Sequence, residues 1–196
     1  MLAIIGQSIR QLREENGISL EELASRAGIS VEKLDKIERN ETTPSLRVLL
    51  RISRALGAKL GTFLGGKEEE RTATLVRCEE LAENPIFAGN DAERNGHLRF
   101  YSLAQGQTDR HMEPLVIEIE PGKTAGSDTE EPKPRSEHAG EEFLYVLSGE
   151  ATLYYGNEIH RLQPGDSIYY NSTVPHLLAN ETSETVRVLA VLYMLY

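Results

Sequence analysis

The spacing of apolar residues changes once along this chain, and the change divides it into a helical part and a β part. From residue 4 to residue 64, apolar side chains recur every three or four residues, as in a helix with one buried face. After residue 97 they alternate with polar residues, as in half-buried strands. The short alternating runs lie at 98–103, 115–120, 143–147, 151–155, 167–170 and 186–193. Turns with Gly or Pro separate them, so the sequence predicts an all-α domain followed by an all-β sandwich or barrel.

The domain boundaries follow from the same pattern. We expect a helical domain over 1–66, a linker over 67–97 that can hold one strand at 73–77, and a β domain over 98–196. Gly28 follows the second predicted helix, where a left-handed residue lets the chain turn sharply. The serines that precede predicted helices and suit their N-caps are Ser19, Ser30 and Ser45.

Charge is distributed unevenly, which matters because the net charge of −10 by itself argues against nucleic acid as a partner. Residues 1–67 carry 11 Lys and Arg against 8 Asp and Glu, a net charge of +3, and the remainder of the chain carries −13. A small positive excess is sufficient for phosphate contacts when the cations share one face. The helical domain therefore stays a candidate for DNA binding, with the acidic domain facing away from the DNA.

The cysteine count and the apolar runs restrict the cellular setting. The single cysteine, Cys78, excludes an internal disulfide and a multi-thiolate metal site. No segment has the ~18 consecutive apolar residues of a membrane helix, and the apolar start of the chain is too short for a signal peptide. We expect a cytoplasmic protein without membrane contact.

Residues 19–40, SLEELASRAGISVEKLDKIERN, have the pattern of two short helices around a tight turn. This segment and its continuation to residue 64 resemble the helix-turn-helix of the phage-repressor (Cro/C1 or XRE) family of transcriptional regulators. The resemblance implies that the second of these helices enters the major groove of double-stranded DNA. It implies base-edge contacts from Ser30, Val31, Glu32, Lys33 and Lys36, and backbone contacts from Arg39, Asn40, Thr43 and Arg47.

Two positions depart from the usual pattern of this family. Leu20 stands where many members have a polar residue that contacts phosphate, and Asn40 stands where glycine is common. Asparagine tolerates the left-handed conformation better than other residues with a side chain. Without the surrounding motif, the charged residues would be interpreted as an ordinary solvated helix face, and a protein that kept the fold without DNA affinity is the matching alternative.

In the β domain, the stretches 138–149 (HAGEEFLYVLSG) and 164–180 look like the two sequence motifs of the cupin family. The resemblance covers roughly residues 99–193 and implies a double-stranded β-helix, or jelly-roll, barrel. The chain as a whole is similar in particular to regulators that fuse a repressor-type helix-turn-helix to a cupin in this order. The predicted fold class is therefore multidomain, with an all-α helix-turn-helix domain and an all-β cupin domain.

Cupins commonly hold a divalent metal with three histidines and one glutamate, and this sequence offers His138, Glu142 and His176. His138 and Glu142 differ by an even number of residues, so a regular strand would point both into the barrel. Two histidines and a carboxylate suit Fe(II), Mn(II), Ni(II) or Zn(II). The fourth ligand position is Ser136, a poor ligand, so an empty pocket in which these residues only form hydrogen bonds is the alternative.

The resemblance also implies that the barrel binds a small-molecule effector. Aromatic residues at strand spacing are more often plain core, but four inward-pointing tyrosines are candidates for the pocket wall. The candidate pocket residues are Tyr101, Ser136, His138, Glu142, Tyr154, Tyr169 and His176, and the fourth tyrosine is Tyr145.

Two functions from different classes fit these patterns. The first is a ligand-responsive transcriptional regulator, not an enzyme, whose homodimer binds an operator with two half-sites. The second is a mononuclear non-haem iron enzyme with His138, Glu142 and His176 as iron ligands, because hydroxypropylphosphonate epoxidase has the same domain layout and ligand spacing. The acidic β domain has few basic residues for a phosphonate, and the plausible ones are Arg99, Arg135 and Arg161. The regulator is therefore the favoured interpretation.

Overall fold

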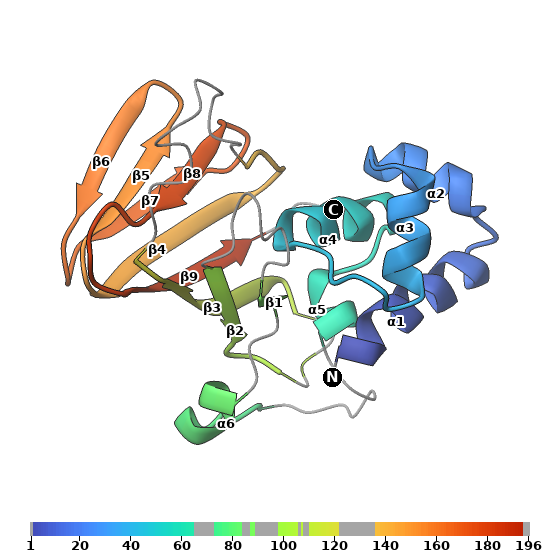
Figure 1. Ribbon diagram of the computed structural model, residues 1–196, viewed down its shortest axis with the longest axis horizontal. Helices are drawn as coiled ribbons and strands as arrows, with labels where there is room; N and C mark the ends of the chain where they lie inside the picture. Colours follow the sequence, from blue (N-terminus) through green and yellow to red (C-terminus); the bar gives the residue numbers. More distant parts are fainter. Residues whose placement is uncertain are drawn as a thin grey trace.

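The structure of the chain is a computed structural model that describes residues 2–64, 73–83, 87–88, 98–105, 107, 110–121 and 136–193. A group of short helices lies beside a β barrel, and the first five helices all precede the first strand (Figure 1). None of the described helices is both long and apolar enough to cross a membrane. The helices are α1 (Leu2–Glu15), α2 (Leu20–Ala27), α3 (Val31–Glu38), α4 (Leu46–Leu56), α5 (Leu60–Leu64) and α6 (Cys78–Glu83).

The helical domain has its own apolar core, to which each of its five helices contributes. The fully buried side chains include Ile9, Leu23, Leu34, Ile37, Leu49, Ile52, Leu60 and Phe63. Because these positions carry the helical period noted in the sequence, each short helix gains most of its stability from this shared core rather than from its own propensity.

The predicted helix boundaries are confirmed by their caps. The hydroxyl oxygens of Ser19, Ser30 and Ser45 accept hydrogen bonds from the backbone N–H three residues on, at 3.1, 3.2 and 3.4 Å. Such a cap satisfies one otherwise unpaired amide and contributes about 1 kcal/mol. Gly28 ends α2 with φ 59°, in the left-handed region where a residue with a side chain would be strained.

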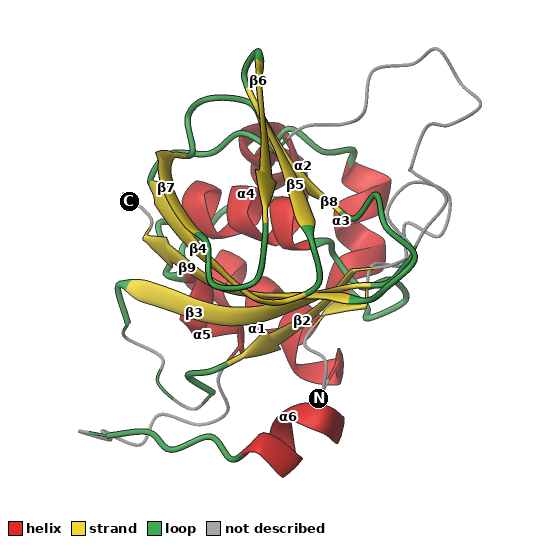
Figure 2. Cartoon of the chain, turned by 90° about the vertical axis from the view of Figure 1, so that its left-hand side faces the viewer, coloured by secondary structure: helices red, strands yellow, loops and turns green. Residues whose placement is uncertain are grey.

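The barrel consists of two antiparallel sheets with the strand orders β1-β2-β3-β9-β4-β7 and β6-β5-β8. Figure 2 shows the two sheets around a common interior, with the helical domain behind them. The strands are β1 (Phe87–Ala88), β2 (Leu98–Ser102), β3 (Met112–Ile119), β4 (Glu141–Ser148), β5 (Ala151–Tyr155), β6 (Glu158–Leu162), β7 (Ser167–Asn171), β8 (His176–Ala179) and β9 (Val186–Tyr193). The fully buried side chains of the interior include Leu115, Leu144, Leu153, Val188 and Ala190.

The segment between the two domains differs from the sequence-based expectation. Residues 73–77 form neither helix nor strand, and α6 follows them. The strand of this region is β1, which pairs with β2 through Phe87 opposite Phe100. The domain boundaries expected at residues 66 and 97 lie outside the described residues and stay predictions.

Two strands of the small sheet were not among the predicted runs. β6 has mostly polar and exposed residues, and β8 has only four residues. Neither shows the alternation on which the strand predictions depended.

Candidate functional site

Helix α3 is held against α1 by a buried ion pair. Arg13 of α1 donates from Nε to Oε1 of Glu38 at 2.7 Å and from a terminal nitrogen to Oε2 at 2.8 Å. Its other terminal nitrogen donates to the carbonyl oxygen of Ile18 at 3.0 Å. The hydrogen bond with Glu38 outweighs burial and raises the pKa of Arg13. A two-point contact of this kind fixes orientation as well as distance, so α3 is presented at a set angle to α1.

The residues predicted to contact bases lie together on the exposed side of α3 and at its N-cap. Val31 is 39% exposed, which is high for a large apolar side chain. Glu32 and Lys36 are exposed and form an ion pair of 2.7 Å one helical turn apart. Lys33 is half-buried, and its backbone N–H donates to the hydroxyl of Ser30. Glu32 and Lys36 thus share the exposed side of α3, and Val31 and Lys33 lie at its two edges.

The residues predicted to contact the DNA backbone surround the end of α3 and the start of α4. Arg39 pairs with Asp35 at 3.1 Å. Thr43 is half-buried in the turn after α3, and Arg47 is exposed in the first turn of α4.

Asn40 has a structural role that the sequence did not reveal. Its φ of 59° confirms the left-handed conformation. Its Oδ1 also accepts a hydrogen bond from the backbone N–H of Gly6 at 3.2 Å. A Cβ at Gly6 would lie 2.1 Å from the carbonyl oxygen of Ile37, so α1 can approach α3 this closely only through a glycine. Asn40 therefore joins the end of α3 to α1.

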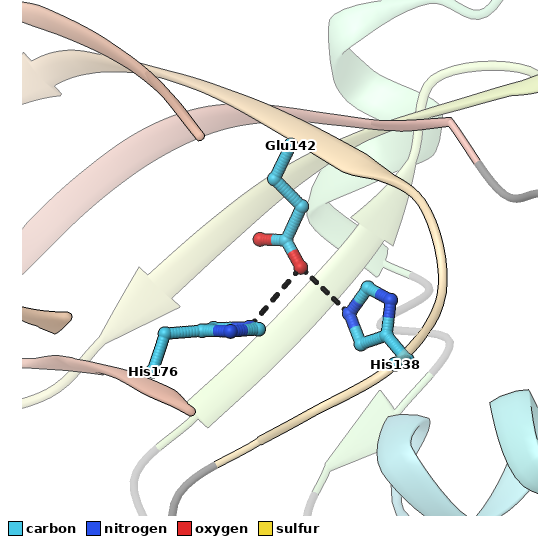
Figure 3. A group of neighbouring side chains, drawn as sticks. All are labelled: His138, Glu142 and His176. Carbon is cyan, nitrogen blue, oxygen red and sulfur yellow. Dashed lines mark ion pairs between the residues drawn. The ribbon is translucent and has the colours of Figure 1, made fainter. Parts of the chain in front are cut away.

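Inside the barrel, His138, Glu142 and His176 point toward one another (Figure 3). Oε1 of Glu142 lies 2.7 Å from Nε2 of His138 and 3.2 Å from Nε2 of His176. The three candidate ligand atoms lie within 4.8 Å of one another, and all three side chains are almost fully buried. The predicted cluster is therefore present in the fold.

The local structure that positions these residues differs from the prediction in one respect. Glu142 lies on β4 and His176 begins β8, but His138 precedes β4. The expectation that one regular strand carries both His138 and Glu142 is wrong, because the chain turns at Gly140, whose φ is 129°. Backbone hydrogen bonds fix the segment before this turn. Ser136 and His176 each donate from the backbone N–H to the carbonyl oxygen of the other, and the backbone N–H of His138 donates to the carbonyl oxygen of Ser172 at 2.9 Å.

Two further residues complete the surroundings of Glu142. The hydroxyl of Tyr170 donates to Oε2 at 2.6 Å, and that of Ser172 donates to Oε1 at 3.3 Å. Burial alone would raise the pKa of Glu142, but the hydrogen bonds from His138 and His176 lower it below its ordinary range. The carboxylate is therefore ionised inside the barrel. The sequence analysis did not identify Tyr170 or Ser172.

The hydrogen bonds of the two histidines fit a bound cation. Nδ1 of His176 lies 2.9 Å from the carbonyl oxygen of Val174, which can only accept, so Nδ1 carries a proton. Burial would lower the pKa of His176, but contact with the Glu142 carboxylate raises it, and the protonated ring donates from Nε2 to that carboxylate. In the neutral ring, the Nε2 lone pair is available to a cation held between the two groups. A backbone carbonyl that orients a ligating histidine is common at metal sites. In addition, Nδ1 of His138 is buried and has no partner among the described residues. This cluster can hold a divalent metal.

Three of the predicted pocket tyrosines lie outside the barrel interior. Tyr169 is 62% exposed, and Tyr101 donates to Glu118 on the outer side of the large sheet at 2.9 Å. Tyr154 donates to Glu181, on the opposite side of β5 from the fully buried Leu153. Successive strand residues face opposite sides, so an error of one residue in phase is sufficient to misplace a side chain. The fourth candidate, Tyr145, is also 38% exposed.

The tyrosine that does face the interior on β7 is Tyr170. It lies opposite Glu142 in the pairing of β4 with β7. Its ring centroid is 5.3 Å from that of Tyr155 and 5.2 Å from that of His176. Tyr170 and Tyr155 therefore face the barrel interior, where the sequence analysis had placed Tyr169 and Tyr154.

A second buried ion pair, between Arg110 and Glu113, lies on the interior side of the large sheet near Glu142. Strand pairing places Glu113 and Glu142 on either side of Leu192. Arg110 donates from Nε to Oε2 of Glu113 at 2.8 Å, and Ser102 donates to Oε1 at 3.2 Å. Burial raises the pKa of Glu113, although Arg110 opposes this shift.

Of the basic residues considered for a phosphonate, Arg99 and Arg161 are exposed and Arg135 lies outside the described residues. Arg99 pairs with Glu120 at the end of the large sheet. Neither described arginine is buried with the cluster.

Comparisons with known proteins agree with this two-part architecture. Residues 9–63 match the helix-turn-helix family model, and residues 115–192 match the cupin domain model. The HTH-type transcriptional regulator y4dJ of Sinorhizobium fredii is 33% identical over 57 residues, which cover 29% of this chain and 74% of the relative. The chain belongs to the HTH-type transcriptional regulators. This regulator carries a cupin domain behind its helix-turn-helix.

The similarity extends over both domains in other proteins. The HTH-type transcriptional regulator PuuR of Escherichia coli is 22% identical over 186 residues, which cover 94% of this regulator and 92% of PuuR. A solved HTH_3 family transcriptional regulator from Vibrio cholerae has the same fold, with a TM-score of 0.71, 21% identity and coverage of 100% and 97%.

The enzyme alternative gains no support from these comparisons. Hydroxypropylphosphonic acid epoxidase from S. wedmorenis is 24% identical over 96% of each chain, but its TM-score of 0.46 indicates only a weak overall structural similarity. The sequence relatives are transcriptional regulators, so the interpretation as a regulator rather than an enzyme stands.

Proposed function

We propose that this protein is a cytoplasmic, sequence-specific transcriptional regulator that binds operator DNA through α3 and a small-molecule effector in its barrel. The observation that supports the DNA-binding role most directly is the exposed surface of α3. There, Glu32 and Lys36 lie one turn apart, with Val31 and Lys33 at the two edges of the same exposed side, on a helix that Arg13 fixes through Glu38. A helix with such a fixed orientation can place its N-terminal residues against base edges.

We further propose that the regulator acts as a homodimer. One recognition helix of eight residues makes few base contacts, which is too little for tight specific binding. Two copies related by two-fold symmetry would place two recognition helices on successive half-sites, about 34 Å apart along the DNA.

Lys33→Ala tests the role of α3. A selection from random duplexes with the full chain first yields a preferred sequence, and fluorescence anisotropy then measures affinity for it at several salt concentrations. Loss of one phosphate contact lowers the slope of log affinity against log salt by about 0.9, and loss of one base contact lowers affinity by about tenfold. Arg54→Ala is the matched control, because it removes one exposed cation from the last turn of α4. No enriched sequence in the selection, or equal effects of the two variants, would contradict the proposal.

For the barrel, we propose that His138, Glu142 and His176 hold one divalent metal, with Fe(II), Mn(II), Ni(II) and Zn(II) as the candidates. Such a metal would supply a Lewis-acidic point of attachment for the effector. The support is the donor set itself, two imidazole nitrogens around one ionised carboxylate, together with the proton fixed on Nδ1 of His176.

Metal content tests this part of the proposal. The purified protein is incubated with each of the four metals, and bound metal is measured by mass spectrometry after removal of the excess. Glu142→Gln should remove most of the bound metal, because the amide is a far weaker ligand than the carboxylate. His160→Ala is the control, since His160 lies on β6 and pairs with Glu158 outside the cluster. Equal metal content in wild type and both variants would exclude this site.

A further inference from the structure

The side of the large sheet that faces away from the barrel interior carries a group of exposed apolar residues. Of the eight exposed large apolar side chains among the described residues, five lie here, namely Met112, Tyr145, Leu147, Tyr169 and Tyr193. Strand pairing places half-buried apolar residues beside them, with Phe143 opposite Val191 and Tyr145 opposite Leu189. We call these residues, together with Pro114 on β3, the outer sheet face. Monomeric proteins rarely expose a contiguous apolar patch of this kind.

We propose that the outer sheet face is the surface through which two copies of this chain form a dimer. The inference names the interface for the homodimer proposed above and therefore rests on that proposal. Both copies contribute the same patch, as in an isologous two-fold interface.

Charge favours a second copy over other occupants of this face. The chain beyond residue 67 has a net charge of −13, so two such domains repel each other over most of their surfaces. On the outer sheet face, however, the charges near one end compensate each other. Arg187 pairs with Glu118 at 3.1 Å, and Arg99 pairs with Glu120. Glu141, which lies opposite Tyr193 and is hydrogen-bonded to Tyr169, adds one negative charge at the other end of the face. Two barrels can therefore approach through this face with less repulsion than over the rest of their surfaces, whereas DNA would find no excess of positive charge there.

The size of the face is also sufficient. Four strands spaced by about 4.8 Å and about seven residues long cover roughly 19 Å by 24 Å, or on the order of 450 Å² in projection. Protruding side chains make the accessible area larger than the projection. A stable interface buries about 800 Å² on each partner, so this face can supply an interface of ordinary size.

Tyr145→Lys tests the interface by placing a charge at the centre of the face, beside Leu189. Sedimentation equilibrium at micromolar concentration, without DNA, should give about twice the chain mass of 21.9 kDa for wild type and the chain mass for the variant. Tyr169→Lys, at a more exposed position of the same face, should weaken the dimer in the same direction. Circular dichroism confirms that each variant is folded.

Ile159→Lys is the matched control, because Ile159 is a 63% exposed apolar residue on β6, outside this face. It should remain dimeric. Folded Tyr145→Lys and Tyr169→Lys proteins that stay dimeric would overturn the assignment of the face. A monomeric wild type would also overturn it, including the case in which the protein instead co-sediments with phosphatidylcholine vesicles. Since no DNA is present, these outcomes do not depend on operator binding.

Discussion

The ion pair between Arg13 and Glu38 gives the most direct test of how α3 is held. Glu38→Gln keeps the shape of the side chain but removes its charge, and it places an amide N–H₂ where one oxygen accepted from Arg13. Removing one partner of a buried pair typically costs about 3–5 kcal/mol. The Arg13 side chain is 12% exposed and keeps its hydrogen bond to Ile18, so we take the lower end, about 3 kcal/mol.

Circular dichroism at 222 nm follows the unfolding of the helical domain. For a domain of this size, about 3 kcal/mol corresponds to a fall in Tm of roughly 12–24 °C. Glu22→Gln is the control, because Glu22 is an exposed glutamate whose ion pair with Arg26 lies on the surface of α2, and it should leave Tm unchanged. A loss below about 1 kcal/mol for Glu38→Gln would refute the view that this pair holds α3 in place.

Two predictions concern the barrel. Tyr170→Phe removes the hydroxyl that donates to the buried Glu142 carboxylate at 2.6 Å, so urea denaturation should show that the free energy of unfolding falls by about 1–3 kcal/mol. Tyr169→Phe, at an exposed position, should have little effect. Arg110→Met leaves the Glu113 carboxylate buried without its cation and should cost about 3–5 kcal/mol at neutral pH. Burial raises the folded pKa of Glu113, and loss of Arg110 raises it further, so the variant takes up a proton at a higher pH than wild type. The deficit should therefore shrink as pH falls through the folded pKa of Glu113 in the variant. A deficit that is constant with pH would contradict this explanation.

The features that could be predicted from the sequence are those that depend on neighbouring residues. N-caps, the left-handed turn at Gly28 and the left-handed Asn40 each need only a few adjacent positions, and the structure confirms them. The cluster of His138, Glu142 and His176 was also found, because motif spacing carries information about a common barrel position even when the local backbone is misjudged.

The features that were missed depend on pairing between distant segments. Whether Tyr169 or Tyr170 faces the interior is decided by the register of β7 against β4, which a single alternating run does not fix. The contact of Arg13 with Glu38 joins positions 25 residues apart, on helices whose relative orientation only the packed core defines. The sequence shows both residues but contains no local signal that pairs them.

The charges of α3 indicate how this regulator can be selective for sequence. Lys36 is paired with Glu32, and Arg39 is paired with Asp35, so two of the four cations predicted to contact DNA have an acidic residue one turn away. Non-specific affinity grows with the number of phosphates that a protein neutralises, and such pairing reduces that number. The acidic barrel reduces it further. Affinity for an operator must then come from base contacts that only the matching sequence offers. In the proposed dimer, binding to a second half-site increases that affinity further. Linking two weak sites can strengthen binding by about 10²–10⁴ without any new contact, so dimerisation through the outer sheet face, as proposed above, would raise operator affinity without that face touching DNA.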